Sequence, residues 1–437
     1  MFKTLQNAFK IKEIRSRMLF TFLMLIVIRL GSQLPVPGVD RTLFSSWFQN
    51  LMGDNFNFLS AFTGGSFEKM SVFALNITPY ITSSIIMQLL TIAIPKLEEM
   101  QKEGEDGRKK IAAITRYVTV GLALIESTAM AIGFRKQNMM TESGALGIIT
   151  VIVALTAGSA FLMWIGEQIT ENGVGNGISI VLTINIISRI PQDFASLFDQ
   201  FMKGKSFATA TLAAIIIAAV VIGTVVLTVI LGGGERRIPV QYAKKVQGRK
   251  IVGGQSSHIP LKVNTGGVIP IIFASSLMQL PIVLSSFFPA KSDNWWQKVL
   301  RALNSGNWFK TATPVYSVGV LVYIILVVFF AYFYTSITFN PLEVSENMKK
   351  QGGFVPGIRP GKPTSEYLTK ILNYIIFIGA IGLIIVALIP ILFNGLFGAS
   401  VSFGGTSLII IVGVILETMK QIESMMLVRN YKGFLND

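Results

Sequence analysis

Cysteine is absent from this 437-residue sequence, and histidine occurs only once, as His258. A chain without cysteine has no disulfide framework, no thiolate metal site and no cysteine nucleophile. A single histidine also excludes a histidine-rich metal or catalytic site. Charged residues are scarce, at 14% of the chain, against roughly 25% in an ordinary soluble domain. This composition leaves little material for a large soluble domain.

Long apolar runs are abundant instead. Hydrophobic residues make up 51% of the chain, and the mean hydropathy is +0.59. A membrane-spanning helix needs about 20 apolar residues, so ten spans need about 200. We therefore predict an all-α polytopic membrane protein with ten transmembrane helices. The candidate spans lie near residues 18 to 34, 72 to 94, 112 to 134, 147 to 166, 177 to 190, 207 to 231, 267 to 288, 314 to 339, 371 to 393 and 406 to 428.

The fifth of these runs is short and ends before Pro191. If it were re-entrant, the chain would have about nine spans. With ten alternating spans, 26 of the 38 Lys and Arg residues fall on one side of the membrane, together with both termini. Because basic loops stay in the cytoplasm, this asymmetry favours ten spans with both termini cytoplasmic.

Two segments resemble nucleotide-binding motifs, but each lacks a glycine that its motif requires. The glycine run from Gly173 to Gly177 has Ile178 where a dinucleotide fingerprint needs its last glycine. Lys205 and Ser206 resemble the end of a phosphate loop, but Asp199 occupies the position of its first glycine. We expect no nucleotide site, no metal and no cofactor in this chain.

One acidic residue falls well inside a predicted span. Glu126 lies in the third apolar run, where an ionisable side chain often marks an ion or proton pathway. A buried glutamate bonded to a neighbouring helix is the alternative. A secondary transporter therefore remains a rival to a passive channel, and a membrane enzyme is less favoured because no nucleophile and base stand together.

Polar residues gather in one unusual stretch, residues 55 to 71, which leads directly into the second apolar run. Irregular polar backbone is tolerated at membrane depth only where protein or water surrounds it. The stretch is therefore predicted to line or fill a cavity. An ordinary amphipathic surface segment has a similar composition and stays open as an alternative.

Two cytoplasmic loops are more basic than a simple connection requires. Residues 232 to 266 carry seven Lys or Arg and one acid, Glu235, and residues 340 to 370 carry five Lys or Arg and three acids. Structured basic loops suit an acidic protein or an RNA partner. A role in setting topology alone is the alternative.

The motifs along the chain resemble those of the SecY family, the central subunits of bacterial protein-translocation channels. They occur in the family's order from end to end: Phe62 to Gly65, Ile77 to Ile81, Ile86 to Leu90, Lys102 to Glu105, Trp164 to Thr170, Gly173 to Ser179, Gln255 to Asn264, Phe354 to Gly361 and Phe403 to Ser407.

This resemblance implies two inverted, pseudo-symmetric halves around a central pore, here residues 1–205 and 206–437. The first half would hold helices one to five, with a plug half-helix near residues 55–71. The second half would hold helices six to ten and the basic loops near 232–266 and 340–370. A ring of aliphatic side chains would close the pore: Ile77, Ile81, Ile178, Leu182, Ile272 and Ile410.

The resemblance assigns three further sets of residues. The plug would include Phe62, Thr63, Gly64, Gly65 and Ser66. The lateral gate, formed by the second and seventh helices, would carry Thr78 and Gln88, with Asn176 nearby. Docking of cytoplasmic partners would fall on Lys244, Arg249, Lys250 and Arg359.

The activity that the resemblance implies is that of a passive protein-conducting channel, not an enzyme. It would pass unfolded secretory proteins across the bacterial cytoplasmic membrane and release transmembrane segments laterally into the lipid bilayer. The implied partners are the small membrane subunits SecE and SecG, the motor ATPase SecA, the ribosome with its ribosomal RNA, signal peptides and nascent chains.

Overall fold

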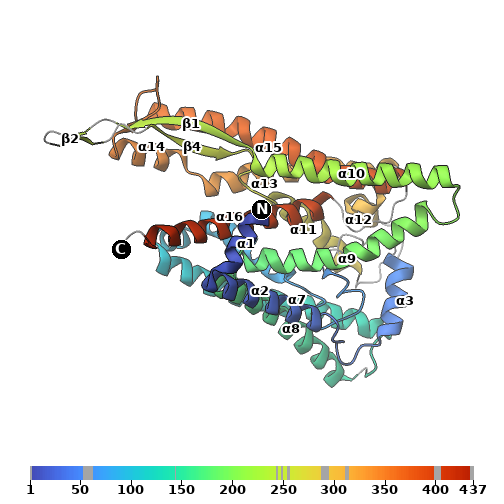
Figure 1. Cartoon of the computed structure of the whole chain (residues 1–437). Helices are drawn as coiled ribbons and strands as arrows, with labels where there is room; N and C mark the ends of the chain where they lie inside the picture. The colour runs from blue at the N-terminus through green and yellow to red at the C-terminus, as the bar shows by residue number, and fades with distance from the viewer. Residues whose placement is uncertain are drawn as a thin grey trace.

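Long α-helices make up most of the chain (Figure 1). The computed structural model describes residues 2–52, 63–142, 144–242, 245–247, 250–252, 256–286, 295–310, 314–397 and 405–433. Each of the ten predicted spans contains a helix. These helices are α2 (Lys12–Gly31), α5 (Thr78–Ala93), α7 (Glu105–Lys136), α8 (Ala145–Asn172), α9 (Gly177–Phe201), α10 (Phe207–Gly233), α11 (Ile269–Ser286), α13 (Val318–Thr338), α15 (Lys362–Phe397) and α16 (Gly405–Gly433).

Five helical stretches of the described chain are long and apolar enough to cross a membrane. They are α7, α8, α10, the stretch Pro314–Lys350 that contains α13, and α15 up to Phe393. A sixth span results if α5 and α6 (Pro95–Lys102), which meet at a bend of 100°, form one broken span. The protein is therefore a multi-pass helical membrane protein.

The bend between α5 and α6 has a local cause. Ile94 has extended backbone angles, and Pro95 follows it at the start of α6. Proline disfavours helical angles at the preceding residue and lacks an N–H for the helix. The apolar run therefore ends here, and the amphipathic helix α6 leaves in a new direction.

The fifth helix is longer than the sequence predicts. We expected it to end before Pro191, yet α9 contains Pro191 and continues to Phe201. Its second part is held by packing, because Leu197 is buried and lies with Phe201 against Ile217 and Val221 of α10. Apolar packing against α10 thus stabilises a helix in which proline removes one backbone hydrogen bond.

The described helices pack in the same scheme in both parts of the chain. In the first part the packed pairs are α5–α7, α7–α8, α8–α9, α2–α8 and α2–α9. In the second part they are α11–α13, α13–α15, α15–α16, α10–α15 and α10–α16. Replacing each helix of the first set by the span five places later along the chain reproduces the second set.

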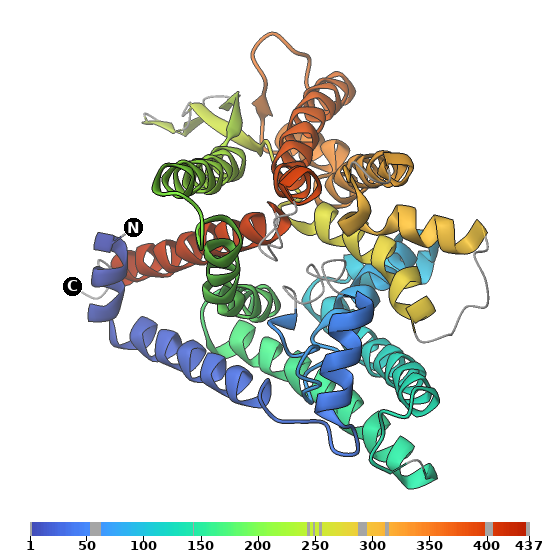
Figure 2. The same cartoon turned by 90° about the vertical axis from the view of Figure 1, so that its right-hand side faces the viewer.

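Helices α9 and α16 make the most extensive contact between these two sets, and they lie between them in Figure 1. Helix α1 (Phe2–Lys10) also packs against α16, so the two ends of the chain lie close together in Figure 2. The packed pairs given above for α5 and α11, which are α5–α7 and α11–α13, each lie within one set. The two sets are thus joined mainly along one seam.

The two basic loops fold together into one small structure. Strand β1 (Glu235–Tyr242) pairs antiparallel with β4 (Ser256–Lys262) and, on its other edge, with β5 (Gly353–Phe354) from the second loop. Strands β2 (Lys245–Gln247) and β3 (Lys250–Val252) form a separate hairpin. Helix α14 (Pro341–Lys350) completes this end of the molecule (Figure 1).

The sheet has its own apolar core. Ile238 and Val240, two residues apart on β1, are buried on one face, as strand alternation requires. They cluster with Val355 and with Met348 of α14. The small sheet is therefore an addition to the all-α fold that we predicted.

The opposite end of the molecule holds α3 (Arg41–Met52) and the connection between α9 and α10 (Figure 1). Phe44 and Phe48 of α3 pack against Phe67, with ring centroids 5.7 Å apart in both pairs. Phe44 also meets Phe134 of α7 edge to face at 5.5 Å. The remaining elements are α12 (Trp295–Leu303) and the short helices η2 (Ser305–Asn307) and η3 (Pro314–Ser317).

Candidate functional site

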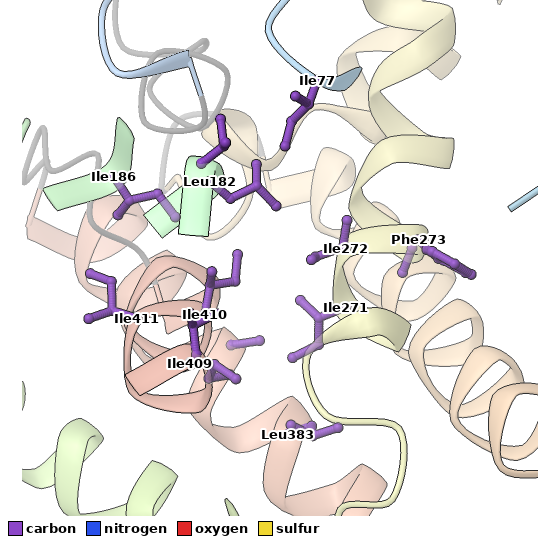
Figure 3. Packing of buried hydrophobic residues seen from close by; sticks show 14 of the residues in the cluster. Ile77, Leu182, Ile186, Ile271, Ile272, Phe273, Leu383, Ile409, Ile410 and Ile411 are labelled. Carbon is purple, nitrogen blue, oxygen red and sulfur yellow. The ribbon is translucent and has the colours of Figure 1, made fainter. Parts of the chain in front are cut away.

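A cluster of aliphatic side chains lies at the centre of the molecule, where both sets of helices contribute (Figure 3). Four of the predicted ring residues are buried in it, namely Ile77, Leu182, Ile272 and Ile410. The other two, Ile81 and Ile178, are partly buried and pack against it. All six predicted ring residues therefore meet in one cluster, which we call the central cluster.

The six side chains come from the beginning of α5, from α9, from α11 and from α16. In two of these helices they form pairs four residues apart: Ile77 with Ile81, and Ile178 with Leu182. Residues with this spacing lie on the same face of a helix. In Figure 3 the labelled side chains of Ile77, Leu182, Ile272 and Ile410 point toward a shared central region.

Local sequence brings these helix ends together. Pro79 stands in the first turn of α5, a favoured place for proline. Asn176 caps α9, because its side chain accepts a hydrogen bond from the backbone N–H of Ser179 at 3.3 Å. A Cβ at Gly177 would collide with the carbonyl oxygen of Gly166 in α8. Glycine at position 177 thus allows α8 and α9 to approach closely beside Ile178.

The chemistry of these six residues is simple, since none of them has a donor, an acceptor or a charge. They can exclude water and ions by packing, and they offer an ion no ligand. Branched aliphatic side chains also form no directional bonds to a passing molecule. The central cluster is therefore suited to sealing a passage without binding what goes through it.

The predicted plug is only partly described. Phe62 lies outside the described residues, whereas Thr63 and Ser66 are buried at 1% and 2% exposure. Gly64 and Gly65 have positive φ values of 62° and 78°, and the chain from residue 64 to 77 consists of turns and one β-bridge instead of a helix. Part of this polar segment is packed within the protein, whereas Lys69 is exposed. Its role as a plug stays a prediction.

The three predicted gate residues occupy different places. Thr78 and Gln88 are half-buried on α5, and the Oε1 atom of Gln88 is buried without a hydrogen-bond partner in the described structure. Asn176 is exposed and serves as the cap of α9. The described side chains of these three residues share no hydrogen bond with one another. The structure thus places two of them on the predicted gate helix and the third apart.

Of the predicted docking residues, Lys244 and Arg249 lie outside the described residues. Lys250 begins β3 and pairs with Gln247 across the hairpin. Arg359 is exposed in the loop between β5 and α15, and its carbonyl oxygen accepts a hydrogen bond from Thr364 Oγ1 at 2.9 Å. Pairing of β1 with β5 brings the two basic loops to one end of the molecule.

Glu235, the acidic residue of the first basic loop, lies beside Arg237 on strand β1. The guanidinium of Arg237 lies 2.6 Å from Glu235 Oε1, and its hydrogen bond lowers the pKa of the Glu235 carboxyl below the ordinary value. Glu235 is therefore ionised and neutralises Arg237. Among the bases of the two loops whose side chains the structure describes, Arg237 is the one held in an ion pair.

Glu126 is half-buried in α7. Among the described residues, no three His, Cys, Asp or Glu side chains gather into a group that could hold a metal ion. The described part of the chain thus presents two candidate sites. One is the central cluster, and the other is the end of the molecule that carries the two basic loops, which we call the basic end.

Sequence reasoning missed one set of polar residues beside the central cluster: Glu68, Asn76 and Arg189. Asn185, a polar residue within the short fifth apolar run, belongs with them. The signal was present, since Asn185 and Arg189 stand on an apolar helix and such residues need partners. Their partners lie more than 100 residues away in sequence.

Comparison with known proteins gives one consistent result. A sequence model described as SecY matches residues 71–419. The protein translocase subunit SecY of Corynebacterium glutamicum is 40% identical over 450 residues, covering 98% of this chain and 99% of that protein.

Solved structures share the fold at lower identity. A SecY protein, reported with a plug domain that stabilises the closed state of the translocation channel and maintains a membrane seal, matches with a TM-score of 0.61 at 17% identity, over 94% of this chain and 92% of that one. The yeast Ssh1 complex, idle and bound to the yeast 80S ribosome, matches with a TM-score of 0.60 at 14% identity, over 95% and 89%. From its sequence and its fold, the chain belongs to the SecY family.

Proposed function

We propose that this chain is the channel subunit of a bacterial protein translocase. In this role it passes unfolded secretory proteins across the cytoplasmic membrane and releases transmembrane segments laterally into the bilayer. The observation that carries the proposal is the central cluster, in which six aliphatic side chains from four helices meet between two sets of helices. Membership of the SecY family supports the same function.

The six residues act as a pore ring: Ile77, Ile81, Ile178, Leu182, Ile272 and Ile410. At rest their packed side chains close the membrane to ions, because a bare aliphatic constriction excludes charged solutes. When a polypeptide enters, the side chains change rotamer and pack around it. Since they form no hydrogen bonds or ion pairs, no sequence in the passing chain is held tightly enough to stop.

The transport path lies between two inverted halves, residues 1–205 and 206–437, with five spans in each. The repeated packing scheme of the two helix sets supports this division. An odd number of spans per half gives the second half the opposite orientation in the membrane. The excess of Lys and Arg on one side supports cytoplasmic termini and ten spans.

A plug and a lateral gate complete the channel. The plug comprises residues 55–71, including Phe62, Thr63, Gly64, Gly65 and Ser66, and rests against the outer side of the ring. The gate opens between α5 and α11, with Thr78 and Gln88 on α5, and Asn176 contributes to it from the N-cap of α9. The unpaired Gln88 Oε1 supports a weak seam here, since a buried acceptor without a donor destabilises the closed state.

The basic end receives the partners that drive transport. Lys244, Arg249, Lys250 and Arg359 contact the motor ATPase SecA or the ribosome, whose RNA complements their charge. SecE and SecG accompany the chain in the membrane. The chain itself hydrolyses nothing, because the energy comes from SecA or from translation.

Reconstitution tests the function directly. The chain, purified with its small membrane subunits, is placed in lipid vesicles with SecA, ATP and a radiolabelled secretory precursor. We expect the precursor to become protected from added protease, and protection to require ATP. A precursor that stays fully digestible, while vesicles with a related translocase protect it, would contradict the proposal.

A further inference from the structure

Two polar pairs tie α9 to the plug and to the segment that follows it. Asn185 Nδ2 donates a hydrogen bond to Asn76 Oδ1 at 3.0 Å, and Arg189 Nη1 lies 2.8 Å from Glu68 Oε2. We call these four residues the clasp. Both partners on α9 lie one turn apart, so the two pairs form a line along one face of that helix.

Three of the four clasp residues are well removed from solvent, whereas the side chain of Glu68 is 30% exposed. Asn76 is 1% exposed, Asn185 3% and Arg189 8%. Arg189 Nε is buried without a hydrogen-bond partner in the described structure, so the bond to Glu68 is an important compensation for burying this guanidinium. Separating either pair without replacing its bonds therefore has a substantial free-energy cost.

Asn76 is held from two sides. Its φ value of 53° lies in the left-handed region, which asparagine adopts more readily than most residues. Its carbonyl oxygen accepts a hydrogen bond from Ser159 Oγ of α8 at 3.0 Å, while its side chain bonds to Asn185. The chain is thus fixed at the residue before Ile77.

The backbone of the segment also rests on α9. A Cβ at Gly64 would lie 2.9 Å from the carbonyl oxygen of Asn185, and one at Gly65 would lie 3.5 Å from Arg189 Nη1. Glycine at both positions lets the predicted plug residues approach the clasp closely. Plug, clasp and α9 therefore move together unless the polar pairs break.

The clasp adjoins two ring positions. Asn76 directly precedes Ile77, and Asn185 follows Leu182 by about one helical turn. A shift of the clasp changes the position of Ile77 relative to α9. The packing of the ring on this side therefore depends on bonds made outside the ring.

We propose that the clasp holds the plug and Ile77 in the resting position, so that its strength determines how readily the closed channel loosens. The inference rests on the proposed function of the channel. Glu68, Asn76, Asn185 and Arg189 are positioning residues that act through the plug and Ile77. An entering polypeptide opens the channel by separating these pairs.

Thiol labelling of the plug tests this in the complete complex. The chain has no cysteine of its own, so Ser66→Cys introduces a single thiol at a site with 2% exposure. In reconstituted vesicles we expect slow reaction with a water-soluble maleimide. Adding Glu68→Gln or Asn185→Ala should raise the labelling rate about tenfold, equivalent to about 1.4 kcal/mol.

Arg116→Gln is the matched control. Arg116 forms an interhelical ion pair with Glu167 at 2.6 Å, and this pair lies on α7 and α8 away from the clasp. Its loss should leave the labelling rate unchanged. The double exchange of Glu68→Arg with Arg189→Glu should restore slow labelling in part, because it re-forms an ion pair of opposite direction.

A purely structural role predicts a different pattern. It would lower the thermal stability of the clasp variants and of Arg116→Gln alike, with no specific rise in labelling or in halide leak through empty vesicles. Unchanged labelling and leak in Glu68→Gln and Asn185→Ala, in vesicles that still translocate precursor, would overturn the clasp and leave the proposed function intact. Failure of the unmodified channel to translocate would instead overturn the proposed function.

Discussion

The central cluster and the basic end use opposite chemistry. The cluster is buried, aliphatic and uncharged. The basic end carries a small sheet with exposed charges, and it exposes Arg359 in the loop that follows β5. A site that seals by apolar packing tolerates a change of one aliphatic residue for another and does not tolerate a charge. A docking site that binds through its charges does not tolerate their reversal. Substitutions that exchange these two chemistries should therefore separate the two functions.

The largest effect is expected from a charge in the ring. Ile272→Asp places a carboxylate in a buried apolar cluster, where an unpaired charge costs several kcal/mol and draws in water. We expect a continuous halide leak through vesicles that hold the protein without precursor. Ile272→Val should keep the vesicles tight. Equal leak in the two variants would show that position 272 does not belong to the seal.

Reversal of charge at the basic end comes next. Arg359→Glu should reduce SecA-driven translocation at least about tenfold, which corresponds to about 1.4 kcal/mol of lost docking free energy. The amount of protein inserted in the membrane and the tightness of empty vesicles should not change. Arg359→Lys should retain most activity, and Lys362→Glu, a neighbouring exposed charge, should have a smaller effect. Normal export by Arg359→Glu would remove this residue from the docking site.

A moderate effect is expected at the gate. Gln88→Leu replaces a buried unpaired acceptor by an apolar side chain of similar size, which should stabilise the closed gate by about 1 kcal/mol. Lateral release of a model transmembrane segment should slow severalfold, as followed by its crosslinking to lipid. Gln88→Asn, which keeps an amide, is the control. Faster release in Gln88→Leu would contradict the proposed gate.

A smaller effect is expected from a conservative change in the ring. Leu182→Ile keeps the side-chain volume, and such exchanges usually cost less than about 1.5 kcal/mol. Leak and translocation should both stay within about twofold of the unmodified channel. The cost of the exchange, below about 1.5 kcal/mol, is shared by the whole packed cluster, and only part of it affects the seal. A severe defect would mean that the ring recognises shape specifically, contrary to the comparison above.

Glu126 tests the rival interpretation of the chain as a solute transporter. Glu126→Gln should leave translocation of precursor unchanged, because the channel function assigns this residue no proton or ion. The measurement is protease protection beside uptake of small solutes in the same vesicles. Loss of solute uptake by a normally inserted Glu126→Gln protein would favour a transporter.

Helix positions were predictable from the sequence because apolar runs are long and their loops carry an uneven charge. All ten predicted runs contain a helix, although α9 continues beyond Pro191. That extension could not be predicted, since it depends on the packing of Leu197 against a helix that follows later in the chain. Local rules mark where proline disturbs a helix and do not report what compensates for it.

The candidate sites, too, were only partly predictable from the sequence. Composition identifies Ile77 and Ile272 only as core residues, and their assignment to one ring came from the resemblance to the SecY family. Pairing of β1 with β5 joins segments more than 100 residues apart, and no local sequence pattern predicts this pairing. The clasp is also non-local, because Asn76 and Asn185 become meaningful only when α9 lies beside residues 63–77.

Crosslinking from the ring tests the central claim most directly. Ile81→Cys and Ile272→Cys each place a single thiol in a chain that has none, on α5 and α11 respectively. With a secretory precursor stalled during SecA-driven transport, both thiols should form crosslinks to the precursor, and Ala195→Cys, at an exposed position of α9, should form none. Absence of a crosslink at both ring positions, with the stalled precursor present in the vesicles, would contradict a passage through the central cluster.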